Sequence, residues 1–147
     1  MIRALLFALM LTSASLNGFG QAATSAKYPR VVTELSVTRQ SETIPITPFF
    51  TPKTDGIYQV SAYMVVTVPG TQGCSDFWVL IVSWIDESGV NTETNVPPVR
   101  CIGGSSPSTI VARGVAGKPL KYQVLNSDLP SGEEYDLFLV VEQLINK

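Results

Sequence analysis

The amino-acid sequence predicts an all-β protein, an antiparallel sandwich or barrel of about eight strands. Apolar and polar residues alternate with a period of two along most of the chain, and a helical period is hard to find. Segments rich in glycine, proline and serine separate the alternating runs, and these residues favour turns. The length of 147 residues is that of a single domain.

The clearest alternation lies in residues 58–68 and 135–141, where every second residue is apolar. Shorter runs of the same kind cover residues 30–38, 43–46, 90–96, 109–115 and 120–125. Residues 77–85 differ, because both sets of alternate positions are apolar, which predicts a strand shielded from water on both faces. Before the run at 58–68, a turn at Asp55-Gly56 predicts a glycine with a positive φ.

The first 23 residues have the order of a secretory signal peptide. Arg3 supplies a positive charge, residues 4–11 are apolar, and small residues follow up to Ala22 and Ala23. A membrane anchor is the alternative, but a spanning helix needs about 20 apolar residues. We therefore expect cleavage after Ala22 or Ala23, leaving a single domain of residues 24–147 that is secreted or periplasmic and has no membrane span.

Two cysteines flank the apolar run at 77–85 and the run that follows it. A hairpin turning at residues 86–89 places Ile85 opposite Val90, and the same pairing places Cys74 opposite Cys101. Opposed residues of an antiparallel pair lie ~4.5–5.5 Å apart at Cα, within reach of a disulfide. Because an exported protein meets an oxidising compartment, we predict a Cys74–Cys101 disulfide, with two unpaired buried thiols as the alternative.

The same pairing predicts which side of residues 77–85 faces outward. One set of alternate positions, which contains both tryptophans, shares its face with polar residues of the next strand, and the other set faces the core. Exposed aromatic residues of this kind mark an interface or a ligand platform. The alternatives are that another segment of the chain covers them, or that a bulge near Pro97-Pro98 exchanges the two faces. The candidate platform consists of Tyr63, Trp78, Leu80, Val82 and Trp84.

The composition argues against most catalytic and nucleic-acid functions. The chain has no histidine, and its 10 Lys+Arg residues against 12 Asp+Glu give a net charge of −2, without the basic excess of a nucleic-acid binder. The acidic residues Asp128, Glu133, Glu134 and Asp136 surround a turn, but their spacing matches no calcium loop, and we expect them to be solvated. We expect no enzyme activity, no metal and no cofactor.

One segment carries a resemblance to a known family. Phe50-Thr51-Pro52, Gly56-Ile57-Tyr58 and Ser61-Ala62-Tyr63 resemble a segment of the complement-globular-head and tumour-necrosis-factor-like jelly rolls. The chain is also similar to small β-sandwich proteins of bacteria and phages that have no assigned activity. The resemblance implies a jelly-roll sandwich that assembles with itself, as a trimer around an aromatic axis. The residues to examine for that axis are Tyr58, Tyr63, Trp78, Trp84 and Phe138.

Three functional hypotheses follow. The first is a secreted, non-enzymatic structural or interaction protein, assembled as a homo-oligomer that binds a protein or surface partner. The second is a carbohydrate-binding sandwich that stacks sugar rings on Trp78, Trp84 and Tyr63. The third is a hydrolase built on carboxylates alone, which needs Asp86 or Glu93 close to a second, buried acid.

Overall fold

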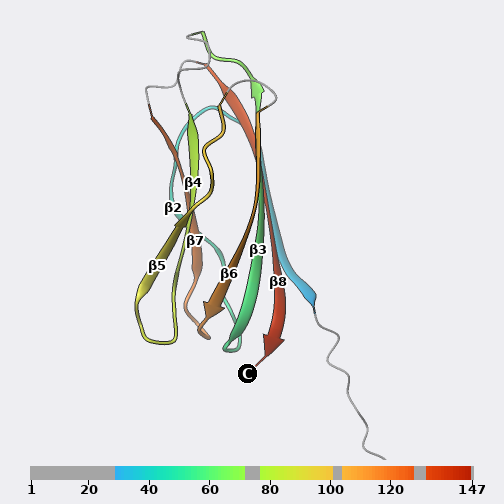
Figure 1. Cartoon of the computed structure of the whole chain (residues 1–147), viewed down its shortest axis with the longest axis vertical. Helices are drawn as coiled ribbons and strands as arrows, with labels where there is room; N and C mark the ends of the chain where they lie inside the picture. The colour runs from blue at the N-terminus through green and yellow to red at the C-terminus, as the bar shows by residue number, and fades with distance from the viewer. Residues whose placement is uncertain (1–28, 72–76, 101–103, 128–131, 147) are drawn as a thin grey trace, which may run out of the picture.

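The chain folds into two four-stranded antiparallel sheets that pack face to face (Figure 1). This computed structural model describes residues 29–71, 77–100, 104–127 and 132–146, and the predicted signal peptide, Cys74 and Cys101 lie outside these ranges. Within them the secondary structure is entirely β, so the predicted antiparallel sandwich is confirmed. The strands are β1 (Arg30–Gln40), β2 (Ile44–Phe50), β3 (Gly56–Val68), β4 (Trp78–Ile85), β5 (Asn91–Asn95), β6 (Ser105–Gly114), β7 (Leu120–Asn126) and β8 (Glu134–Asn146).

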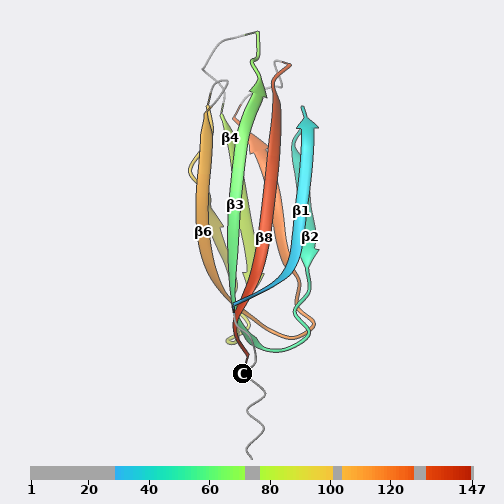
Figure 2. The ribbon, with the colours of Figure 1, turned by 90° about the vertical axis from the view of Figure 1, so that its right-hand side faces the viewer.

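The strand order is that of a jelly roll. One sheet has the order β1-β8-β3-β6 and the other the order β2-β7-β4-β5. The first strand therefore pairs with the eighth, the second with the seventh, the third with the sixth and the fourth with the fifth, as in an antiparallel ribbon wound around a barrel. Figure 2 shows β6, β3, β8 and β1 side by side in the sheet that faces the viewer.

The core lies between the inner faces of the two sheets, and the alternating pattern of the sequence fills it. Every second residue of β3 from Tyr58 to Val66 is buried, and so is every second residue of β8 from Tyr135 to Gln143. These two strands lie at the centre of their sheet, and their buried residues pack against those of β4 and β7. Two large sheets suffice to keep the apolar residues of a domain of this size from water.

The β4–β5 hairpin has a register that differs by one residue from the predicted register. Ile85 pairs with Asn91 rather than Val90, because five residues, not four, separate the two paired residues. Asp86 and Val90 face each other next, which leaves a three-residue loop of residues 87–89. The amide of Asp86 donates to the carbonyl of Val90 (3.0 Å), and that of Gly89 to the carbonyl of Asp86 (3.0 Å). Gly89 has a φ of 79°, as expected for the last position of a three-residue hairpin loop. A change of one residue in register exchanges the two faces of a strand.

Gly56 is required for a different reason from the predicted one. Gly56 is not among the described residues with a positive φ. A Cβ atom at this position would lie 2.5 Å from the carbonyl oxygen of Ile145, because β3 and β8 approach closely here. The glycine therefore makes room for a neighbouring backbone rather than for an unusual turn.

Replacement of Gly89 tests the hairpin loop. We expect Gly89→Ala to lower the free energy of unfolding by about 1–2 kcal/mol, the cost of a left-handed conformation for a residue with a Cβ. No atom lies within 4 Å of the position of this Cβ, so the loss comes from the backbone alone. Chemical denaturation measures it, and Gly89→Asn should lose less, because asparagine tolerates positive φ. Equal stability of Gly89→Ala and the wild type would contradict the loop conformation.

Asp86 makes the same loop sensitive to acid. Its Oδ1 accepts hydrogen bonds from the Ser88 hydroxyl (2.6 Å), the Ser88 amide (2.9 Å) and the Val90 amide (3.0 Å). The hydrogen bond from the Ser88 hydroxyl, followed by that from the Val90 amide, holds the pKa of the Asp86 carboxyl below its ordinary value. The stabilisation is therefore present above about pH 4 and is lost as the pH falls through the lowered pKa of the folded state.

We expect Asp86→Asn to lower the unfolding temperature at pH 7, and the difference from the wild type to shrink toward pH 2, as the pH falls through the lowered pKa of the wild-type carboxyl. Thermal unfolding followed by circular dichroism between pH 2 and pH 7 measures the difference. Glu42→Gln, at the exposed turn after β1, is the matched control for the loss of a surface carboxylate. A destabilisation of Asp86→Asn that is the same at both pH values would contradict this role.

Candidate functional site

Four of the five residues predicted to form an exposed platform lie in the core. Trp78, Leu80 and Val82 are fully buried and Trp84 is 7% exposed. The prediction is wrong for these four because the three-residue loop turns their side of β4 toward the second sheet. Their neighbours are Thr92 and Thr94 on β5 and Val96 directly after it, and not the asparagines and Glu93.

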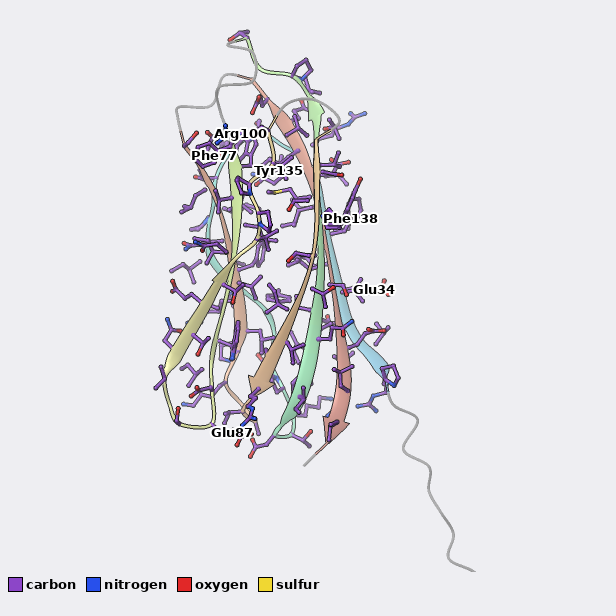
Figure 3. The ribbon with its side chains drawn as sticks, viewed as in Figure 1. Glu34, Phe77, Glu87, Arg100, Tyr135 and Phe138 are labelled. Atoms are coloured by element: carbon purple, nitrogen blue, oxygen red, sulfur yellow. The ribbon has the colours of Figure 1, made fainter. Side chains whose placement is uncertain are left out.

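Trp78 joins the two sheets through both its ring and its nitrogen. Its Nε1 donates a hydrogen bond to Glu133 Oε2 (3.0 Å), and its ring centre lies 4.4 Å from that of Tyr135 on β8. The Tyr135 hydroxyl donates to the carbonyl of Glu42 (3.0 Å). Burial, with a smaller contribution from Tyr122, raises the pKa of the Tyr135 phenol, which is therefore neutral at physiological pH. Figure 3 shows Tyr135 between the two sheets.

Glu133 differs from the expectation that the acidic residues around residues 128–136 are solvated. Its side chain is 1% exposed, and its Oε1 has no hydrogen-bond partner in the described part of the chain. The sequence holds a signal for this burial, since a buried tryptophan requires an acceptor for its Nε1 proton. Glu133 is best understood as that acceptor.

Within the described ranges, Asp86 does not lie near the buried acid Glu133, as a hydrolase built on these carboxylates would need. Asp86 follows the end of β4, whereas Glu133 contacts Trp78 at the start of the same strand. A strand of 8 residues is roughly 26 Å long, but glycoside hydrolysis needs two carboxylates ~5–10 Å apart. Among the described residues there is also no group of three His, Cys, Asp or Glu side chains that could hold a metal.

Tyr63, the fifth predicted residue, is exposed on the outer face of the β1-β8-β3-β6 sheet. It is 42% exposed, lies opposite Phe138 of β8 in the register, and has its ring centre 6.2 Å from that of Phe138. Phe138 is 38% exposed. In Figure 3, Phe138 and Glu34 both point away from the second sheet. Of the residues expected at an aromatic axis, Tyr58, Trp78 and Trp84 are buried. Tyr63 and Phe138 are exposed.

Tyr63 and Phe138 form the centre of a larger apolar patch, which we call the outer-face patch. Pro107 of β6 lies opposite Tyr63, and two half-buried valines, one on β3 and one on β8, lie two residues along the strands. Polar and charged side chains of the edge strands border it: Glu34 and Ser36 on β1, and Ser105 and Thr109 on β6. The outer-face patch consists of Tyr63, Val65, Pro107, Phe138 and Val140.

The outer face of the other sheet is less apolar. Val79, Ile81 and Ile85 form a half-buried row along β4. Their cross-strand neighbours on β5 and β7 are mostly polar, and include Asn91, Asn95 and Gln123. The apolar residues of β4 form one row that is joined on β7 by Leu125 opposite Val79, whereas the outer-face patch spans three strands and has two aromatic rings at its centre.

No helix in the described ranges is long and apolar enough to cross a membrane.

Comparisons with known proteins give no family. No family model matches the chain, and no curated protein matches it. Among solved structures, the chain is similar to one of the infectious bursal disease virus Gx strain, with 12% identity and a TM-score of 0.40, over 81% of this chain and 37% of that one. A structure of the Gt strain of the same virus gives 13% identity and a TM-score of 0.27, over 81% of this chain and 38% of that one. The chain thus spans less than two fifths of the length of these viral chains.

Proposed function

We propose that the protein is a non-enzymatic interaction domain that assembles with itself through the outer-face patch. The observation that carries the proposal is the pair of exposed aromatic rings, Tyr63 and Phe138, side by side on the two central strands of an open sheet face. Binding hot spots have this arrangement, with aromatic residues at the centre and a polar rim that excludes water.

The size of the face suits a second copy of the chain. Four strands spaced about 4.8 Å apart and about ten residues long cover roughly 600 Å² before side chains are considered. A stable protein–protein interface buries about 800 Å² on each partner. Small-molecule sites are instead concave, and an open sheet face offers no such enclosure.

The same observations weaken the two other hypotheses. The carbohydrate-binding hypothesis relied on exposed tryptophans, and both lie in the core. The hydrolase hypothesis relied on a pair of neighbouring acids, but Asp86 caps a hairpin loop and Glu133 lies at the opposite end of the sandwich. We therefore favour binding over catalysis.

Self-association is measured by light scattering on the purified protein at micromolar concentrations. We expect a mass of two or three chains for the wild type and of one chain for the double variant Tyr63→Thr, Phe138→Thr. Loss of an aromatic hot spot costs about 2 kcal/mol or more, which raises the dissociation constant roughly 30-fold for each residue. Threonine preserves the preference for a strand, so both variants should remain folded, as circular dichroism will verify.

Leu125→Thr is the matched control, because Leu125 is 43% exposed on the outer face of the other sheet. It should leave the mass unchanged. A monomeric wild type would contradict self-association. An oligomer that survives the double variant would exclude the outer-face patch as its interface.

We also propose that the protein is exported after removal of residues 1–23 and carries the Cys74–Cys101 disulfide. Support comes from the described residues beside the two cysteines. Trp78 and Val99 exchange two backbone hydrogen bonds of 3.0 Å, although a bulge at Pro97-Pro98 separates this pair from the rest of the hairpin. Cys74 precedes Trp78 by four residues and Cys101 follows Val99 by two, so the Trp78–Val99 pair is the nearest described contact in the sequence to both cysteines.

Mass spectrometry of the exported protein tests both statements. The intact mass should correspond to a chain that begins at Ala23 or Thr24, and an alkylating reagent should label no cysteine until a reductant is added. The variant Cys74→Ser, Cys101→Ser should unfold more easily by roughly 3–4 kcal/mol, if the geometry of the disulfide is unstrained. Two thiols that react without reductant in the folded, exported protein would contradict the disulfide.

A further inference from the structure

A cavity opens at the end of the sandwich where β8 finishes, away from the outer-face patch. Its volume is about 560 Å³, within the range of roughly 300–1,000 Å³ that is typical of small-molecule sites. The first residues of β1, the segment that follows β2, and side chains of β3 and β8 line it. These segments are far apart in the sequence and meet only because β8 pairs with both β1 and β3.

The cavity contains a network of hydrogen bonds centred on Gln143, which is 3% exposed. Its Nε2 donates to the Tyr58 hydroxyl (3.3 Å) and to Thr54 Oγ1 (3.3 Å), and its Oε1 accepts from Arg30 Nη2 (2.9 Å). The Tyr58 hydroxyl donates in turn to the carbonyl of Thr54 (2.8 Å). The network holds one nitrogen of the exposed Arg30 guanidinium at Gln143.

The charged side chains of the cavity have a single sign. Arg30 and Lys53 line it, and no carboxylate does. Asp55 is the acid closest to Lys53 in the sequence. Its carboxylate accepts a hydrogen bond from the amide of Ala116 (2.7 Å) in a neighbouring turn. A guanidinium has five N–H donors, so Arg30 can bind an oxyanion while one of its nitrogens is held by Gln143.

Apolar side chains supply another part of the wall. Val31 is 49% exposed, and the ring of Phe50 packs with its centre 5.3 Å from that of Tyr58. An aromatic or aliphatic group beside Val31, Val32 and Phe50 would be removed from water. We propose that this cavity binds an organic anion, with its carboxylate or phosphate group at Arg30 and Lys53 and its apolar body against this wall.

Nuclear magnetic resonance titrations of the purified protein test the proposal with phenylacetate and phenyl phosphate as probes. Both should shift the backbone amide signals of Thr51, Lys53 and Thr54 and the side-chain amide signals of Gln143. The neutral isostere phenylacetamide should bind at least about tenfold more weakly than phenylacetate, since it lacks a charge-assisted hydrogen bond. Comparison of the two anions distinguishes a carboxylate site from a phosphate site.

Two lysine variants distinguish binding in this cavity from nonspecific attraction of anions to positive charges elsewhere on the surface. Lys53→Gln should weaken the binding of the tighter anion about tenfold. Lys118→Gln is the matched control, because Lys118 is an exposed lysine that does not line the cavity, and it should change binding less than twofold. Circular dichroism should show that both variants are folded.

Three results would overturn the proposal: no shift of these signals at 20 mM probe, equal binding of phenylacetamide, or equal losses in the two lysine variants. The proposal is independent of self-association through the outer-face patch. The double variant Tyr63→Thr, Phe138→Thr should therefore bind the anions with unchanged affinity.

Discussion

The three-residue loop between β4 and β5 decides which side of β4 faces the second sheet, and the packing of the core depends on that choice. Gly89 adopts a left-handed backbone, and Asp86 accepts the hydrogen bonds that close the loop. As a result the tryptophans point inward, where Trp78 packs on Tyr135 and donates to Glu133. With Ile85 opposite Val90, one residue fewer between the paired ends, the indole rings would share a face with the polar residues of β5 and the core would lose its largest side chain.

Most of the fold was accessible from the sequence, because alternation with a period of two identifies a strand with one buried face. This holds for β3 and β8, whose predicted buried residues from Tyr58 to Val66 and from Tyr135 to Val141 are buried in the structure. It fails for β4, which is apolar on both faces, so that alternation gives no preference between Trp78 and Val79. Only the length of the loop distinguishes the faces, and Gly89, the position that sets this length, is also compatible with a four-residue loop.

The candidate sites, like the strands, could be predicted from the sequence only in part. Tyr63 was identified from the sequence, and Phe138 entered through the resemblance to jelly rolls, but their contact required the register between β3 and β8. The cavity was not identified, because Arg30, Lys53 and Gln143 belong to three separate segments and none of them forms part of a motif. Local patterns predict which residues leave water, whereas a site assembled from distant segments is defined by strand pairing. Strand pairing also places the two candidate sites apart: the outer-face patch lies on a sheet face, and the cavity lies at the end of the sandwich.

The position of β8 has a consequence for how the protein is made. Residues 134–146 form a central strand, paired with β1 on one side and β3 on the other, so the sheet β1-β8-β3-β6 cannot close before they have been synthesised. Arg30 pairs with Gln143 across 113 positions of the chain, and contacts of such long range make folding slow. Until β8 emerges, β1 has no partner in its sheet and β3 can pair only with β6. The growing chain therefore cannot complete this sheet until its last described strand has been synthesised.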